Sequence, residues 1–103
     1  MIKSSKISAV HRNGMTEVRL LMSHDMETGL RKDNAGSLIP AWHITEVEVA
    51  CQGRSVFKAQ FGSAVSKNPH LVFRFRGGAK GDVISVSWID NRGNTRRDEG
   101  TIS

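Results

Sequence analysis

Apolar and polar residues alternate over several short stretches of this sequence, with a period of two residues. In EVRLLMSH at 17–24, for example, Val18, Leu20 and Met22 fall on the same side. Because successive side chains of a β-strand point to opposite faces of a sheet, this pattern is typical of a half-buried strand. Similar stretches occur at 43–51, 56–61, 70–76, 83–89 and 95–102. The chain is therefore expected to consist of short strands that each bury one face.

Turn signals separate these stretches. QGRS at 52–55, GGAKGD at 77–82 and DNRG at 90–93 are rich in residues that favour turns. With a further strand candidate at 6–10, the pattern predicts an all-β fold, an immunoglobulin-like antiparallel β-sandwich of about seven strands. The last candidate, at 95–102, carries many charges and is expected at a sheet edge. The 103 residues are expected to form a single domain over 1–103.

One connection is longer than this pattern requires. The 19 residues at 24–42 begin with HDMETGLRKDNAGSLIP, whereas loops longer than about 12–15 residues in compact domains are usually functional or disordered. Apolar residues spaced along it, among them Met26, Leu30 and Trp42, indicate an ordered excursion that returns through a turn at KDNAGS. These side chains either supply contact area for a partner or fold the loop back on its own sheet, and both interpretations stay open.

The same stretch contains possible metal ligands. His24 and Met26 could offer nitrogen and sulfur to copper, and the nearby carboxylates could offer oxygen to a harder cation. The acids lack the spacing of a calcium loop, however, and Arg31 and Lys32 would repel a bound cation. A histidine hydrogen-bonded to the backbone is the preferred interpretation, and no cofactor is expected. A small metal-binding or redox protein that uses His24 and Met26, or Cys51, is the alternative function.

No catalytic constellation is evident, so the chain is not expected to be an enzyme. Cys51 is the single cysteine and ends a strand on its apolar side, where burial raises the pKa of a thiol and makes it inert. The glycine-rich GGAKGD lacks the spacing of a phosphate-binding loop and precedes a strand instead of a helix. What remains is binding, with contact area from the apolar loop residues and directional hydrogen bonds from Arg31.

Charge and hydropathy exclude two other classes of partner. The 15 Lys and Arg against 10 Asp and Glu give a net charge of +5, but the cations are spread along the chain and no aromatic residues adjoin a basic stripe. Nucleic acid is therefore not an expected partner. No apolar segment is long enough for a membrane span or a secretory signal, so no membrane association is expected. Taken alone, these features favour the cytoplasm.

Three runs of the sequence resemble the SoxZ family over roughly residues 17–93. They are HDMETGLRKDNAGSLIPAWHITEVEV, FGSAVSKNPHLVFRF and GDVISVSWIDNRG, and the pattern H-x-M-E-x-G-x-R-K-D…G-x-x-I-P is the most specific part. The resemblance implies the non-carrier subunit of the SoxYZ complex of thiosulfate oxidation. Such a subunit forms a heterodimer with a SoxY-type subunit. The cysteine of the SoxY-type subunit, in a Gly-Gly-Cys-Gly-Gly segment, carries sulfur intermediates to other, transiently bound Sox enzymes.

The resemblance also changes the expected localisation and assigns the long loop to partner binding. Chains of this family are exported to the periplasm with a signal-bearing partner, which would explain the missing signal. The ending RRDEGTIS has no Gly-Gly-Cys-Gly-Gly segment, as expected for the scaffold subunit. A generic assembly module is a further possibility, which the identity of the partner would distinguish. The expected partner-binding residues are His24, Met26, Glu27, Arg31, Lys32, Asp33, Ile39 and Trp42.

Overall fold

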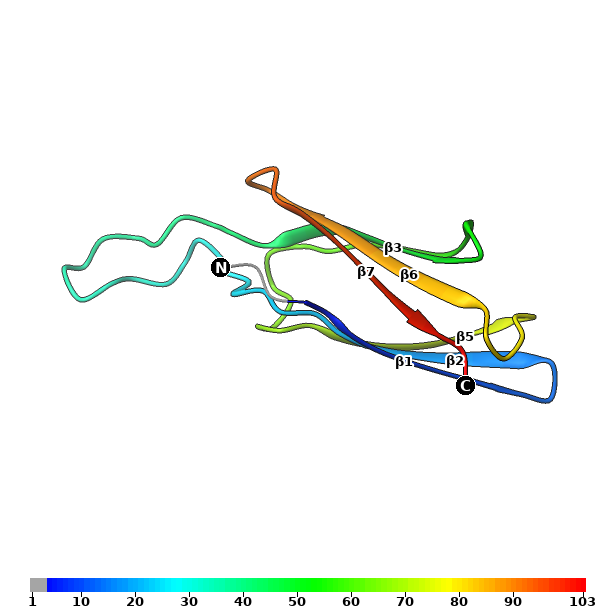
Figure 1. Cartoon of the computed structure of the whole chain (residues 1–103). Helices are drawn as coiled ribbons and strands as arrows, with labels where there is room; N and C mark the ends of the chain where they lie inside the picture. Colours follow the sequence, from blue (N-terminus) through cyan, green and yellow to red (C-terminus); the bar gives the residue numbers. More distant parts are fainter. Residues whose placement is uncertain (1–3) are drawn as a thin grey trace.

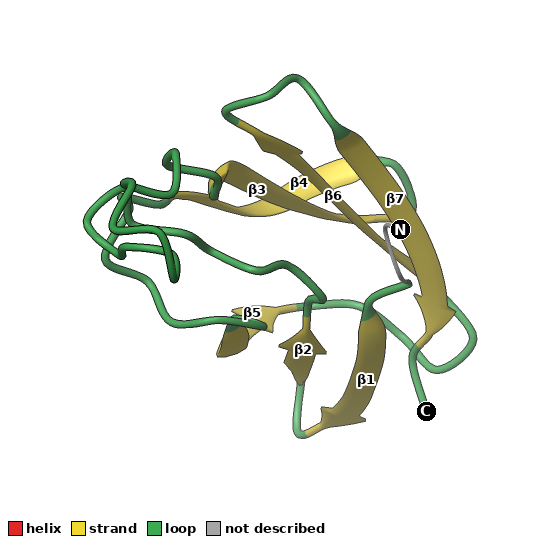
Figure 2. Ribbon diagram, turned by 90° about the vertical axis from the view of Figure 1, so that its left-hand side faces the viewer, coloured by secondary structure: helices red, strands yellow, loops and turns green. Residues whose placement is uncertain are grey.

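The computed structural model describes residues 4–103 as two packed antiparallel sheets without a helix (Figures 1 and 2). One sheet has the strand order β1-β2-β5 and the other the order β4-β3-β6-β7, which is the all-β sandwich that the sequence predicts. The strands are β1 (Lys6–Arg12), β2 (Met15–Leu21), β3 (Ile44–Cys51), β4 (Arg54–Gln60), β5 (His70–Arg76), β6 (Val83–Asp90) and β7 (Thr95–Thr101). No helix in the described part is long and apolar enough to cross a membrane.

The core lies between the sheets and is formed by the inward positions of the alternating stretches. Val18 and Leu20 of β2, Val47 of β3 and Ile84 of β6 are fully buried, and burial of one such side chain contributes roughly 1.5–3 kcal/mol. The alternation at these strands is therefore confirmed. Register follows from it, because a shift of one residue would move each apolar set to the outside.

The two long sides of the sandwich are closed differently. On one side β7 lies at a sheet edge, as its charges predict, and the segment after it runs beside β1, with a hydrogen bond of 2.8 Å from the Ser103 amide to the Ala9 carbonyl. On the other side the rings of Phe57 on β4 and Phe73 on β5 stack with their centroids 4.3 Å apart. Both strands are edges, which is why these aromatic side chains are only half-buried.

The connection between β2 and β3 leaves the sandwich altogether. In Figure 1 it projects as a narrow ribbon beyond the ends of the strands, and it accounts for the elongated form of a molecule of 54 × 20 × 18 Å. The β2–β3 connection thus projects from one end of the sandwich, and the turn between β6 and β7 lies beside the base of this connection.

Candidate functional site

The ribbon at 27–42, here called the arm, is built from two antiparallel sides. Isolated bridges join Glu27 to Trp42 and Lys32 to Leu38. At the base, the amide of Glu27 donates to the carbonyl of Trp42 at 2.6 Å and the amide of Trp42 donates back at 3.0 Å. The arm is therefore an ordered ribbon, as expected, but backbone pairing holds its two sides together, and the exposed Leu30 and Leu38 do not anchor it.

Local sequence determines the tip of the arm. The carboxylate of Asp33 accepts hydrogen bonds from the amides of Ala35 and Ser37, at 2.9 and 3.0 Å. Gly36 follows with a φ of 82°, a left-handed conformation that favours glycine. A turn at KDNAGS is thus confirmed, and Asp33 is engaged in shaping it.

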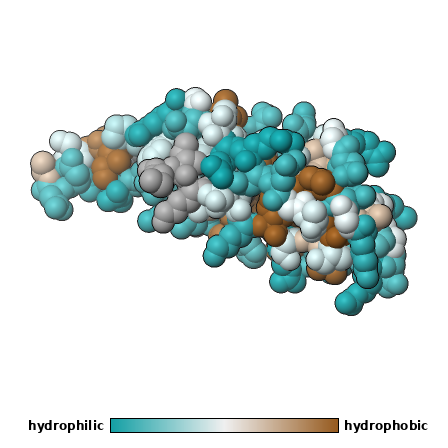
Figure 3. Space-filling view, viewed as in Figure 1, coloured by the Kyte–Doolittle hydropathy of each residue, from teal (hydrophilic) through white to brown (hydrophobic). Residues whose placement is uncertain are grey.

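The arm exposes apolar side chains to solvent. Leu30 is 82% exposed and Leu38 is 59% exposed, and all residues from 30 to 38 are exposed. Figure 3 shows apolar surface on this projecting part, set among hydrophilic residues. Leu30 and Leu38 do not fold back on the sheet, whereas Met26 is buried against it with 4% exposure, so each of the two interpretations left open by the sequence describes different residues of the loop. Both side chains are therefore accessible to a partner.

Charged residues of the arm are arranged along one side of it. The Arg31 Nη2 lies 2.6 Å from Oε2 of Glu27, and the Arg31 Nε lies 3.0 Å from Oε1. The hydrogen bond from Arg31 lowers the pKa of Glu27. Because Arg31 is exposed and Glu27 is only partly buried, this pair contributes little to stability. The pairing with Glu27 orients Arg31 along the arm. Lys32, the next residue, is exposed to solvent.

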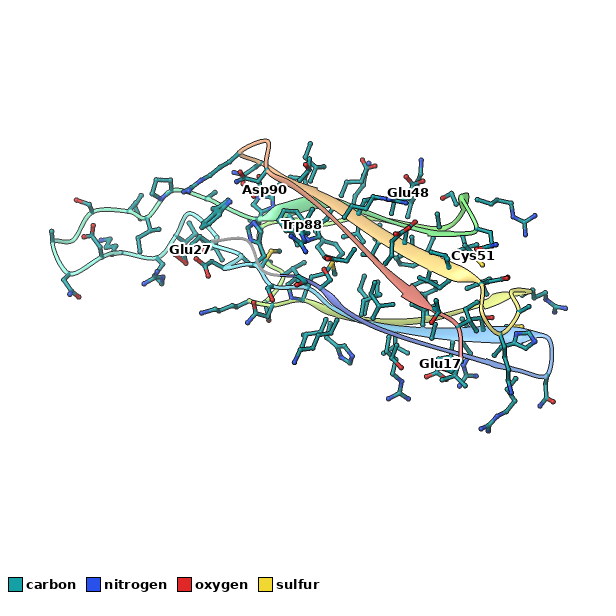
Figure 4. The ribbon with its side chains drawn as sticks, in the orientation of Figure 1. Glu17, Glu27, Glu48, Cys51, Trp88 and Asp90 are labelled. Atoms are coloured by element: carbon teal, nitrogen blue, oxygen red, sulfur yellow. The ribbon has the colours of Figure 1, made fainter. Side chains whose placement is uncertain are left out.

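The base of the arm rests on one buried carboxylate, Asp90, at the end of β6 (Figure 4). Its Oδ2 accepts hydrogen bonds from Nε2 of His24 at 3.0 Å, Nε1 of Trp42 at 2.8 Å and Nδ2 of Asn94 at 3.0 Å. Its Oδ1 accepts from the amides of Arg92 and Asn94, both at 2.9 Å. One side chain therefore joins the start of the arm, its end and the β6–β7 turn.

Two tryptophans and a methionine complete this base. The ring of His24 meets Trp42 and Trp88 edge-on, with centroids 4.9 and 5.3 Å apart. Nδ1 of His24 accepts a hydrogen bond from the amide of Met26 at 3.1 Å, so the proton lies on Nε2, which donates to Asp90. The Sδ of Met26 in turn accepts from the amide of Ile44 at 3.3 Å. The ring nitrogens of His24 and the sulfur of Met26, which the copper hypothesis needs as ligands, are thus hydrogen-bonded to other groups of the protein.

The structure separates the expected partner-binding residues into two groups. His24 and Met26 are buried, with 7% and 4% exposure, and support the base of the arm, so their direct contact with a partner stays a prediction. Trp42 is half-buried, with the Arg92 guanidinium 4.3 Å above its ring. The remaining expected residues lie on the arm itself and are Glu27, Arg31, Lys32, Asp33 and Ile39.

Sequence reasoning missed the residue at the centre of the base. Asp90 was assigned to a turn, because Asp-Asn-Arg-Gly is a common turn sequence. Its position at an inward place of β6, two residues after Trp88, is the signal that could have identified it. A carboxylate at such a position needs several donors, since a buried charge without partners is costly.

Cys51 lies far from the arm. Figure 4 places it toward the opposite end of the sandwich from Asp90. Burial is the main cause that raises its thiol pKa, and the carboxylate of Asp82, 3.9 Å from Sγ, raises it further. The environment therefore disfavours the thiolate, which is the nucleophilic form.

The stability of the fold is expected to depend on pH through Asp90. Burial alone would raise the pKa of this carboxyl, but hydrogen bonds from His24, Asn94 and Trp42 outweigh burial and lower the pKa from 3.8 to about 2. Because the unfolded carboxyl binds a proton more readily, this stabilisation is complete above about pH 4 and is lost as the pH falls through about 2. The loss is on the order of 2 kcal/mol.

Urea unfolding at a series of acid pH values measures this dependence. The Asp90→Asn variant is the comparison, since it cannot titrate at this position and keeps the other carboxylates. The wild-type free energy of unfolding should fall more steeply with acid than that of the variant. Parallel curves for the two proteins would contradict the assignment.

The close approach of the two sides of the arm at Gly29 leads to another prediction. A Cβ at this position would lie 3.2 Å from Cβ of Ala41, and the φ of Gly29 is 87°. Gly36→Ala is a matched control, because it has a similar φ of 82° and open space around it. Amide hydrogen exchange at Glu27 and Trp42 should accelerate by about tenfold or more in Gly29→Ala, as local opening becomes easier. Equal exchange in the two variants would show that contact with Ala41 is unimportant.

Solved structures share this fold at low sequence identity. A hypothetical protein from Pyrococcus horikoshii OT3 has a TM-score of 0.69 at 16% identity, with 99% of this chain and 89% of that chain covered. Superoxide reductase (neelaredoxin) from Archaeoglobus fulgidus, in the reduced form, gives 0.61 at 20%, covering 99% and 87%. The enzyme of the same name from Ignicoccus hospitalis gives 0.60 at 15%, covering 99% and 82%. Such likeness shows the fold alone.

The family comparison is more specific. No curated protein matches the sequence. The family model described as Sulphur oxidation protein SoxZ matches residues 4–101, which is nearly the whole chain and includes the arm, its base and all seven strands. The resemblance carried by the arm sequence is thereby confirmed, and the chain belongs to the SoxZ family.

Proposed function

We propose that this chain is the non-catalytic partner subunit of a sulfur-carrier heterodimer. In this proposal it supports a SoxY-type subunit whose cysteine carries the intermediates of thiosulfate oxidation, and it helps present that subunit to other Sox enzymes. Membership of the SoxZ family supports a role in Sox sulfur oxidation. The periplasm, reached with a signal-bearing partner, is the compartment that this role requires.

The observation that carries the proposal is the arm. Leu30 and Leu38 are exposed on a ribbon whose base is held by a buried hydrogen-bond network. Apolar side chains held in place before binding lose little conformational entropy when a partner covers them. The oriented guanidinium of Arg31 adds a directional donor beside them. We infer that the arm contacts the SoxY-type subunit and makes the heterodimer stable.

The test is recovery of the tagged chain from its native cells under non-reducing conditions, followed by intact mass measurement. A partner of similar size that ends in a glycine-flanked cysteine, with mass adducts of bound sulfur species, is the expected result. Fractionation of the same cells should place both chains in the periplasm. Recovery of the chain alone, or with a bound metal, would overturn the proposal.

A further inference from the structure

The outer side of the three-stranded sheet, here called the basic face, carries most of the surplus positive charge of the chain. Its strands come from 6–12, 15–21 and 70–76, and their outward side chains are exposed or half-exposed. The outward positions carry five cations and one carboxylate. The cations are Lys6, Arg12, Arg19, Arg74 and Arg76, and the carboxylate is Glu17. This surplus of four is close to the net charge of +5 for the whole chain.

The fold gathers these cations, which are scattered in the sequence. The register places Arg19 beside Val72, Glu17 beside Arg74 and Met15 beside Arg76, although more than fifty positions separate the partners in the chain. Cations that are spread along the sequence therefore lie together on this face. The other sheet has a balanced outer side, with outward charges at Glu46, Glu48, Lys58, Arg97 and Glu99.

Most of this charge is available to a partner. Glu17 accepts a hydrogen bond from Nε of Arg19 at 3.0 Å and lies 3.5 Å from Nε of Arg74. It thus compensates one charge and contacts one guanidinium group on its own strand β2 and one on the neighbouring strand β5. Figure 4 shows Glu17 on the side away from the other sheet. Within the described residues, Arg12 and Arg76 take part in no ion pair.

Apolar side chains lie between the cations. Val10 is 45% exposed, Val72 is 51% exposed and Leu21 is 37% exposed. A groove of about 590 Å³ over β1 and β2 is lined by Val10 and Met15 together with the cations Arg12, Arg19 and Arg74 and the single carboxylate Glu17. Arginine and methionine mixed with aliphatic side chains are typical of protein interfaces. Single-stranded nucleic acid would need aromatic stacking residues, and the outward positions of these strands carry no Phe, Tyr or Trp.

We propose that the basic face is a second docking surface, which binds an acidic, aliphatic-containing surface of a protein other than the one held by the arm. Seven-residue strands span about 24 Å and three strands span about 14 Å. That is a footprint of roughly 340 Å², well below the roughly 800 Å² per partner of a stable complex. The face is therefore suited to a transient encounter that charge attraction accelerates.

The test uses the full chain and a charge-reversed variant, Arg12→Glu with Arg76→Glu. Both side chains are exposed, so the fold should persist, which circular dichroism would check. The matched control is Arg54→Glu with Lys58→Glu on β4 of the other sheet, which changes the net charge of the chain in the same direction and leaves the basic face intact. The probes are a short peptide of alternating Glu and Val, an oligothymidine and vesicles that contain phosphatidylserine.

The peptide is expected to shift NMR signals of β1, β2 and β5 and to bind the charge-reversed variant at least about tenfold more weakly, in line with the size of electrostatic steering effects. The control variant should bind like the wild type, and binding should weaken at about 0.5 M salt. Equal weakening in both variants would show an effect of net charge alone and overturn the proposal. Tighter binding of the oligothymidine or the vesicles than of the peptide would also overturn it.

The result is independent of the proposed function, because none of these probes is a Sox protein. Assembly with the SoxY-type subunit provides a further outcome. The charge-reversed variant should form the heterodimer as well as the wild type does, since the arm is expected to hold that subunit. Loss of the heterodimer in this variant would show that the basic face is the permanent interface, which contradicts a separate docking role.

Discussion

Replacement of Asp90 with alanine is expected to lower the free energy of unfolding by about 3–5 kcal/mol, as is typical when one partner of a buried charged network is removed. Five hydrogen bonds to this side chain would be lost. The N–H groups of buried His24 and half-buried Trp42 would then lose their acceptor, and an unsatisfied buried donor costs about 1–3 kcal/mol. Urea denaturation at neutral pH measures the difference.

Asp25→Ala is the control for this prediction. Asp25 is an exposed carboxylate near the same base and takes part in no ion pair within the described residues. Its replacement should change the free energy of unfolding by less than about 0.5 kcal/mol, as surface substitutions usually do. If Asp90→Ala cost no more than this, the carboxylate would not hold the arm to the sandwich.

The second large effect is expected on binding. Replacement of both Leu30 and Leu38 with aspartate should weaken association with the SoxY-type subunit by at least about 100-fold, because central apolar interface residues are often worth about 2 kcal/mol each. Stability should remain within about 0.5 kcal/mol of the wild type, since both side chains are exposed before binding. Titration calorimetry with the purified partner measures the affinity.

Ile89→Asp is the matched control for the arm variant. Ile89 is 42% exposed and lies outward on β6, outside the ribbon at 27–42. Binding of this control should stay near that of the wild type. If the arm variant bound the partner with unchanged affinity, the arm would not be the interface, and the family role would require another surface.

Local patterns were sufficient to predict the sandwich. Val18, Leu20 and Val47 occupy inward positions because a period of two leaves no other arrangement that buries them. The tip of the arm was predictable for the same reason, since Gly36 and its neighbours favour a turn whatever surrounds them. These features depend on residues close together in the chain.

The other features of the site depended on contacts between residues that lie far apart in the sequence. Asp90 meets His24 across 66 positions, and no local pattern of either residue indicates the other. The basic face arises because β2 lies between β1 and β5, which brings Arg12, Arg19 and Arg74 onto one surface. Whether Leu30 and Leu38 were covered or exposed also required the path of the ribbon, because spacing alone is the same in both cases.

The paired base of the arm separates the length of the ribbon from the folding of the sandwich. Once the bridge between Glu27 and Trp42 has formed, residues beyond it close a local loop. Doubling the length of such a loop costs only about 0.6 kcal/mol. Insertions or deletions near the tip therefore change the reach of the arm without a large penalty to the core. Evolution can lengthen, shorten or re-sequence this ribbon for a new partner while the same seven strands fold beneath it.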